Sequence, residues 1–267
     1  MDLGVRGRTY VVFGGSRGMG LAAARTLVGD GASVAVVGRD VDRAVAAAGE
    51  LEAVGDGRAV GLAGDLRRAG EADRLLDAAQ EAFGPLRGVA VTTGLGMRGQ
   101  RSLLDATDDD WEDTFADVLM GTVRACRAAA RRLVEAGGGS IVTTSAYSIR
   151  SPKPHQVPYG ALKASVATMT KAMAKTFGPM GVRANCVCPG ATETDVLAGM
   201  RLTVAEERGW PVEEALERVM TEEWGMKVAL GRPGTAQELG DAIAFLLSER
   251  AGYISGALLN VDGGTDF

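Results

Sequence analysis

The segment that decides the fold of this 267-residue chain is Thr9-Tyr10-Val11-Val12-Phe13-Gly14-Gly15-Ser16-Arg17-Gly18-Met19-Gly20. An apolar run ends in a glycine-rich turn, and a helical stretch begins directly after it at Leu21. A strand, a glycine turn and a helix N-terminus together form an anion site, because main-chain N–H groups and the helix dipole point at a bound phosphate. The spacing Gly14, Gly18, Gly20 differs from the commoner GxGxxG fingerprint, and an ordinary tight turn is the alternative interpretation.

A second motif favours the phosphate-binding interpretation. Tyr159 and Lys163 stand four residues apart in Tyr-Gly-Ala-Leu-Lys, so on a helix they share one face. A lysine ammonium favours a phenolate, and we therefore predict that Lys163 lowers the pKa of Tyr159 from about 10. Such a phenol is a proton donor and acceptor near neutral pH.

Short apolar stretches alternate with helical ones along the whole chain. This order predicts an α/β fold, a Rossmann-like doubly wound parallel sheet of about seven strands with helices on both faces, within a single domain over residues 1–267. The expected strands are Thr9–Phe13, Ser33–Val37, Ala59–Leu62, Gly88–Thr92, Ser140–Thr144, Ala184–Cys188 and Ala257–Val261. The expected helices are Gly18–Asp30, Asp40–Val54, Arg68–Phe83, Thr107–Glu135, Val157–Phe177 and Thr235–Leu247.

Residues 195–232 interrupt the alternation near the predicted carboxyl edge of the sheet. They combine many charges with Met200, Trp210, Met220, Trp224 and Met226. An insertion at this place predicts a substrate lid. The alternative is a solvated helical hairpin that packs on the rim of the sheet.

Composition excludes several classes of function. The net charge of −5, with basic residues scattered, shows no nucleic-acid footprint. The three cysteines, Cys126, Cys186 and Cys188, have no metal-like partners and predict buried free thiols in a reducing compartment, with no metal site. No secretory leader is recognised, and no apolar run reaches the ~18 residues that cross a membrane, so we expect a cytoplasmic protein without a membrane partner.

Taken together, the motifs resemble the short-chain dehydrogenase/reductase family in its single-domain form, over nearly the whole chain. The matching pieces, in family order, are Gly14-x-x-x-Gly18-x-Gly20, Asp65-Leu66, Gly94, Tyr159-x-x-x-Lys163, Pro189-Gly190 with Thr194, and Asp262-Gly263-Gly264. We expect only a structural turn at the last of these. The combination is specific for the fold and much less specific for a reaction.

The resemblance implies a nicotinamide dinucleotide cofactor. The residues that it assigns to the cofactor are Gly14, Ser16, Arg17, Gly18, Met19, Gly20, Arg39, Asp65, Leu66, Thr93, Gly94, Tyr159, Lys163, Pro189, Gly190, Thr192 and Thr194. Relatives that bind NAD usually end the second strand with an acidic residue, whereas Gly38 and then Arg39 stand here. Arg17 and Arg39 together suit a ribose 2′-phosphate, which predicts NADP(H). Asp40 complicates this prediction unless it caps the next helix.

The family's chemistry implies that Tyr159 exchanges a proton with a carbonyl oxygen while Lys163 holds the nicotinamide ribose. The family's serine position falls on Ala146, so we expect the adjacent Ser145 to orient the substrate, with Ser148 and Ser151 as alternatives, or with no serine in this role. Val118 stands where relatives often carry an asparagine, which puts the usual proton relay in doubt. His155 in the proline-rich loop is a candidate substrate contact, although a loop histidine is commonly only solvent-exposed.

The resulting prediction is an NADP(H)-dependent oxidoreductase that interconverts a ketone and a secondary alcohol on a moderately hydrophobic small molecule. The alternatives are a non-redox enzyme of the same fold, such as a dehydratase, isomerase or cyclase, and a non-catalytic NADP-binding protein. Related chains pair their long central helices, so a homodimer or homotetramer is expected.

Overall fold

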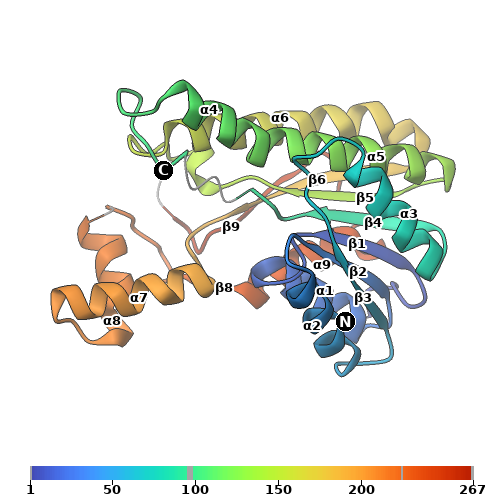
Figure 1. Cartoon of the computed structure of the whole chain (residues 1–267), viewed down its shortest axis with the longest axis horizontal. Helices are drawn as coiled ribbons and strands as arrows, with labels where there is room; N and C mark the ends of the chain where they lie inside the picture. The colour runs from blue at the N-terminus through green and yellow to red at the C-terminus, as the bar shows by residue number, and fades with distance from the viewer. Residues whose placement is uncertain (1, 95–98, 224, 266–267) are drawn as a thin grey trace.

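The computed structural model describes residues 2–94, 99–223 and 225–265 (Figure 1). Its main sheet has seven parallel strands in the order β3-β2-β1-β4-β5-β6-β9. The strands are β1 (Thr9–Phe13), β2 (Ser33–Gly38), β3 (Arg58–Ala63), β4 (Leu86–Val91), β5 (Gly139–Thr144), β6 (Val182–Pro189) and β9 (Leu258–Val261). The predicted doubly wound sheet is confirmed. Its order reverses between β1 and β4, which is where such sheets bind ligands.

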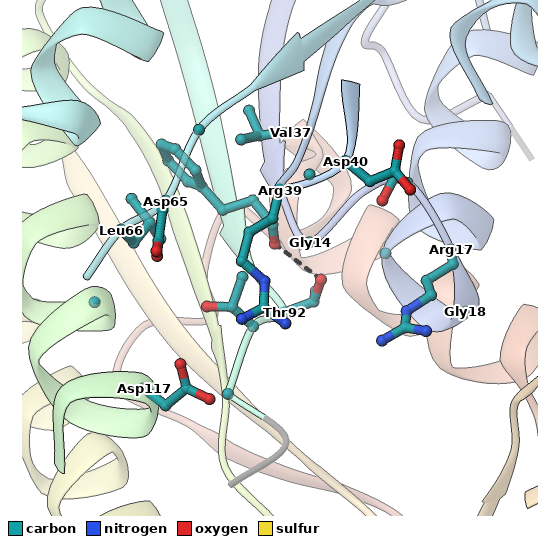
Figure 2. A pocket seen from close by; sticks show the side chains of 18 of the residues that line it. Gly14, Arg17, Gly18, Val37, Arg39, Asp40, Asp65, Leu66, Thr92 and Asp117 are labelled. Atoms are coloured by element: carbon teal, nitrogen blue, oxygen red, sulfur yellow. Dashed lines mark hydrogen bonds between the residues drawn. The ribbon is translucent and has the colours of Figure 1, made fainter. Parts of the chain in front are cut away.

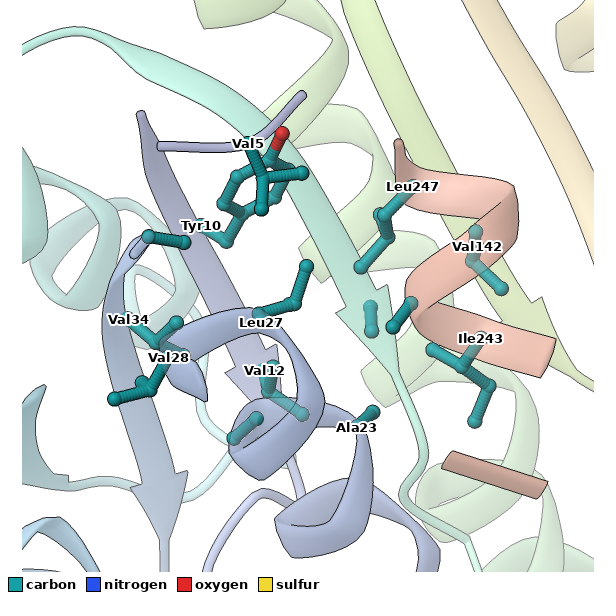
Figure 3. Packing of buried hydrophobic residues seen from close by; sticks show 14 of the residues in the cluster. Val5, Tyr10, Val12, Ala23, Leu27, Val28, Val34, Val142, Ile243 and Leu247 are labelled. Carbon is teal, nitrogen blue, oxygen red and sulfur yellow. The ribbon is translucent and has the colours of Figure 1, made fainter. Parts of the chain in front are cut away.

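Helices cover both faces of this sheet. One face carries α1 (Gly18–Gly29), α2 (Val41–Glu52) and α9 (Ala236–Leu247), and the other carries α3 (Glu71–Phe83), α5 (Gly121–Glu135) and α6 (Val157–Phe177). Side chains of a strand alternate between faces. Val12 therefore packs with Leu27 of α1 and Ile243 of α9 (Figure 3), whereas Val11 packs on the opposite side with α3 and α5.

One predicted helix is wrong in detail. The range Thr107–Glu135 is not one regular α-helix: Thr107 caps α4 (Asp108–Thr114), a π-helical segment follows over Phe115–Met120, and α5 begins at Gly121. The wider turn contains Val118, whose Cα lies only 3.0 Å from where a Cβ on Gly94 would stand. Hydrophobic periodicity does not reveal such a π segment, which frequently marks a functional site.

Residues 195–232 form a small unit at the end of the sheet, visible at the left of Figure 1. It contains α7 (Asp195–Arg208), α8 (Val212–Arg218) and a π turn (Val219–Glu223), and it is flanked by the two-stranded sheet of β7 (Thr192–Glu193) and β8 (Gly234–Thr235). Leu216, Met220 and Met226 make a separate apolar core there, and the Arg218 guanidinium stacks 4.0 Å from the centre of the Trp210 ring. Met200 is exposed, and Trp224 lies outside the described residues.

The prediction about the cysteines is confirmed by the structure. Cys126, Cys186 and Cys188 are buried free thiols, as predicted. Within the described ranges, the helices lack the combination of length and apolarity that a membrane span requires.

Candidate active site

A cleft lies at the carboxyl ends of β1 to β4, where the strand order reverses (Figure 2). Most of the residues predicted for the cofactor line it. They are Gly14, Ser16, Arg17, Gly18, Met19, Gly20, Arg39, Asp65, Leu66, Thr93, Gly94 and Thr194. The glycine turn, the end of β2 and the end of β4 are thus brought together from distant parts of the sequence.

The glycine turn has no room for side chains. Gly14 has a φ of +83°, and a Cβ there would stand 2.7 Å from Oγ1 of Thr92. A Cβ on Gly20 would stand 2.3 Å from the carbonyl oxygen of Gly14. Because α1 begins at Gly18, its positive end opens onto the cleft. These residues fit the phosphates of a dinucleotide, and the buried hydroxyl of Thr93, which has no hydrogen-bond partner within the described residues, fits a polar ligand.

Two exposed arginines lie on the adenosine side of the cleft. Figure 2 shows Arg39 at the end of β2 and Arg17 in the glycine turn, with the intervening space open. Neither guanidinium has a hydrogen bond or ion pair within the described residues. The Asp40 carboxylate accepts a hydrogen bond from the main-chain N–H of Arg43 at 3.1 Å, so it caps α2, as the sequence allowed. The charge presented by this edge of the cleft is therefore largely positive.

Three further side chains line the cleft, of which one was predicted for the cofactor and two were not. The Asp65 carboxylate accepts from the main-chain N–H of Arg67 at 2.9 Å, which shapes the turn after β3. Thr92, which was not among the predicted contacts, donates to the carbonyl oxygen of Phe13 at 2.9 Å and joins the ends of β4 and β1. Asp117 also lines the cleft (Figure 2), and sequence reasoning missed it because it lies in the π segment.

Tyr159 and Lys163 lie together in the first turns of α6. Lys163 is 3% exposed, its Nζ donates to the carbonyl oxygen of Thr144 at 3.1 Å, and the same Nζ is 5.7 Å from the centre of the Tyr159 ring. Pro158 stands at the start of this helix, where its missing N–H costs nothing. The i, i+4 spacing therefore produces the predicted neighbours.

The prediction that the pKa of Tyr159 is lowered is wrong for this structure. Burial raises the pKa of Tyr159 above its ordinary value, and a charge on the nearby Tyr147 would raise it further. Burial also lowers the pKa of Lys163 to about 8, against the opposing effect of Cys186 and Cys188. Removing both groups from water disfavours the charged form of each.

The serine position is occupied differently from the family pattern. The Ser145 hydroxyl donates to the main-chain carbonyl of Lys163 at 2.8 Å, and this bond holds the loop that follows β5 against α6. Ala146 follows, and the Ser148 hydroxyl is buried without a hydrogen-bond partner in the described part of the chain. Val118 is fully buried against Leu162 and Val166, so no side-chain amide stands there. The assignment of Ser145 to substrate orientation remains a prediction.

Other predicted residues lie outside the lining of this cleft. Pro189 ends β6, Gly190 donates its N–H to Val261, and the Thr192 hydroxyl donates to the carbonyl oxygen of Gly190 at 3.1 Å. His155 is exposed and lines a separate shallow hollow with residues 100–102, so the structure does not bring it together with Tyr159. The Asp262 carboxylate accepts from the N–H of Gly264 at 3.1 Å, as in the expected turn, and it also pairs with Arg150 at 2.6 Å.

Comparisons with known proteins agree with this geometry. A family model described as enoyl-(acyl carrier protein) reductase matches residues 14–266. A short-chain type dehydrogenase/reductase of Sinorhizobium fredii is 32% identical, over 97% of this chain and 98% of its own. The L-rhamnose 1-dehydrogenase (NAD(P)(+)) of Azotobacter vinelandii is 33% identical over 96% of both chains.

A solved structure is similar over nearly the whole fold. The L-sorbose reductase of Gluconobacter frateurii, in complex with NADPH and L-sorbose, superposes with a TM-score of 0.91 at 27% identity, over 99% of this chain and 98% of that one. The chain belongs to the short-chain dehydrogenase/reductase family, a family of oxidoreductases.

Proposed function

We propose that this protein is an NADP(H)-dependent oxidoreductase that interconverts a ketone and a secondary alcohol on a small molecule. The pairing of Tyr159 with Lys163 on α6, in a fold whose cleft at the switch point suits a dinucleotide, is the observation that carries the proposal. The cofactor supplies or accepts the hydride when it is bound. Tyr159 gives its proton to the carbonyl oxygen in reduction and takes a proton from the alcohol in oxidation.

Lys163 has two roles in this proposal. Its buried ammonium, held by the carbonyl oxygen of Thr144, lies beneath the phenol and stabilises the phenolate that remains after proton transfer. Its second role is to donate hydrogen bonds to the hydroxyls of the nicotinamide ribose. Pro189, Gly190, Thr192 and Thr194 complete the nicotinamide side of the cofactor site.

The preference for NADP(H) is supported by charge. Gly38 ends β2 without a carboxylate, Asp40 is engaged in capping α2, and Arg17 and Arg39 flank the place of the adenosine ribose. Guanidinium groups bind a 2′-phosphate through paired, charge-assisted hydrogen bonds. The NADPH complex of the similar L-sorbose reductase supports the same choice.

Arg39→Ala tests the cofactor assignment. Hydrogen bonds to charged groups contribute roughly 1.5–3 kcal/mol, so the dissociation constant of NADPH should rise about 10- to 100-fold while that of NADH stays unchanged. Fluorescence titration of both cofactors measures this. Arg25→Ala, on the α1 surface away from the cleft, is the charge-matched control; equal NADPH binding by wild type and Arg39→Ala would contradict the clamp.

The substrate is proposed to be moderately hydrophobic, with residues 195–232 as its lid. The support is the apolar core of Leu216, Met220 and Met226 facing Tyr147 at the end of the sheet. Consumption of NADPH with cyclohexanone, 2-octanone and L-sorbose separates apolar ketones from sugars.

Ala146 and Val118 favour a second candidate, a non-redox enzyme of the same fold. NADPH binding without turnover of any ketone would support this second candidate.

A second copy of the chain is the proposed macromolecular partner. Between α5 and α6 lies an open hollow lined by Val123, Met169, Phe177 and Met180, with Arg127 and Arg131 at its edge. Pairing these helices across a twofold axis would cover the apolar side chains in a homodimer or homotetramer.

A further inference from the structure

A hydrogen-bond donor besides Tyr159 would orient the substrate oxygen, and the family's serine position, Ala146, cannot supply one. Residue 146 is alanine, and the hydroxyl hydrogen of Ser145 is engaged by the main chain of α6 at 2.8 Å. The Ser148 hydroxyl is enclosed, with less than 1 Å² of exposed surface. These three residues leave the orienting role open.

A second tyrosine lies on a segment that packs against α6, the helix of Tyr159. Tyr147 begins the short helix Tyr147–Ile149 that follows β5, and its ring packs on the apolar core of the lid with Met220 and Met226. It remains only partly buried, and Lys153 Nζ stands 6.0 Å from the centre of its ring. The segment of Tyr147 packs on α6 next to Tyr159, since a Cβ on Gly160 would stand 3.9 Å from the carbonyl oxygen of Ser148.

The present partner of the Tyr147 hydroxyl is weak. The hydroxyl donates to the thioether sulfur of Met226 at 3.3 Å. Sulfur of this kind is a poor acceptor, whereas a ketone or alcohol oxygen is a good one. A bound substrate can therefore take over this hydrogen bond at little cost to the lid.

We propose that the Tyr147 hydroxyl, released from Met226, donates the hydrogen bond that orients the substrate oxygen next to Tyr159. No proton leaves Tyr147 in this arrangement, because the proton that is transferred comes from Tyr159. The inference rests on the proposed oxidoreductase function and deepens it. It also explains how a chain with Ala146 keeps two hydroxyl donors at one carbonyl.

Tyr147→Phe is the decisive variant, assayed with NADPH and whichever of cyclohexanone, 2-octanone and L-sorbose wild type reduces fastest. It deletes one oxygen and keeps the ring that fills the lid core. Loss of a hydrogen bond to an oxygen that becomes charged should lower kcat/KM about 10- to 100-fold, with the NADPH dissociation constant unchanged. Tyr10→Phe makes the same chemical change at a buried hydroxyl that has no partner within the described residues, and it should leave kcat/KM unchanged.

Met226→Leu separates substrate orientation from a merely structural contact. It removes the sulfur acceptor and keeps the apolar bulk, so kcat/KM should stay close to that of wild type. A loss equal to that of Tyr147→Phe would show that Tyr147 only fastens the lid, and full activity of Tyr147→Phe would also overturn the inference. Wild type that reduces none of the ketones would instead remove the proposed function, and this inference with it.

Discussion

The two halves of the cleft are built in different ways. The cofactor half is made of main chain: Gly14 and Gly20 approach other atoms so closely that no side chain fits. The catalytic half is made of side chains, and there Ala146 and Val118 replace the polar groups of the family pattern. A main-chain cradle tolerates little change, whereas a hydrogen bond from a side chain can be supplied from a neighbouring position.

The halves also rest on different cores. The glycine turn follows β1, whose Val12 and Phe13 are fully buried in the two large cores of the sheet. Tyr147 instead packs on the small core of residues 195–232. Elements with few buried apolar contacts open more easily, so the catalytic half is expected to move more than the cofactor half.

Tyr159→Phe gives the largest expected effect and acts on the catalytic half alone. Losing the proton donor should lower kcat about 10²- to 10⁴-fold while NADPH binding is kept. Stopped-flow absorbance and cofactor titration measure the two quantities. Tyr253→Phe, at a fully exposed position, is the matched control, and undiminished turnover by Tyr159→Phe would remove the acid–base assignment.

Gly20→Ala tests the cofactor half. Its new methyl would stand 2.3 Å from the carbonyl oxygen of Gly14, so the turn must shift, and we expect a loss of about 1–3 kcal/mol in the free energy of unfolding together with weaker NADPH binding. Gly49→Ala inside α2 meets nothing within 4 Å and should be neutral or stabilising by up to about 1 kcal/mol. Urea denaturation compares the two, and equal stability of both variants would contradict the close-packed turn.

Lys163→Met gives the smallest predicted change in stability, and the pH dependence of that change falls in alkaline solution. Burial lowers the pKa of Lys163 from 10.5 to about 8, so between these values the unfolded chain binds more protons than the folded one. Below pH ~8 both forms are protonated and the full burial penalty is present; the penalty is relieved as pH rises. Wild type should therefore gain about 2 kcal/mol relative to Lys163→Met between about pH 7 and about pH 9.5. A pH-independent difference would mean that the lysine is not desolvated.

Local sequence pattern was sufficient for the fold and for the cofactor cradle. Strand β1 and helix α6 have the predicted bounds, because the apolar run before Gly14 and the helical stretch after Gln156 each carry their own start and stop signals. The glycine spacing, the i, i+4 pair and the position of Arg39 after β2 are patterns that each span only a few residues. Such patterns can be read from one segment at a time, although the structure also presses Gly14 and Gly20 against the distant Thr92.

Tertiary structure alone decided which groups surround the phenol and what they do to its charge. Tyr159 is removed from water by packing that involves the whole fold. The hydrogen bonds from Ser145 to Lys163 and from Tyr147 to Met226 join segments 18 or more residues apart. The π segment around Val118 likewise depends on packing against Leu162 and Val166. Desolvation and hydrogen bonding are set by all the atoms that close around a site, and the spacing of residues along one chain segment does not contain that information.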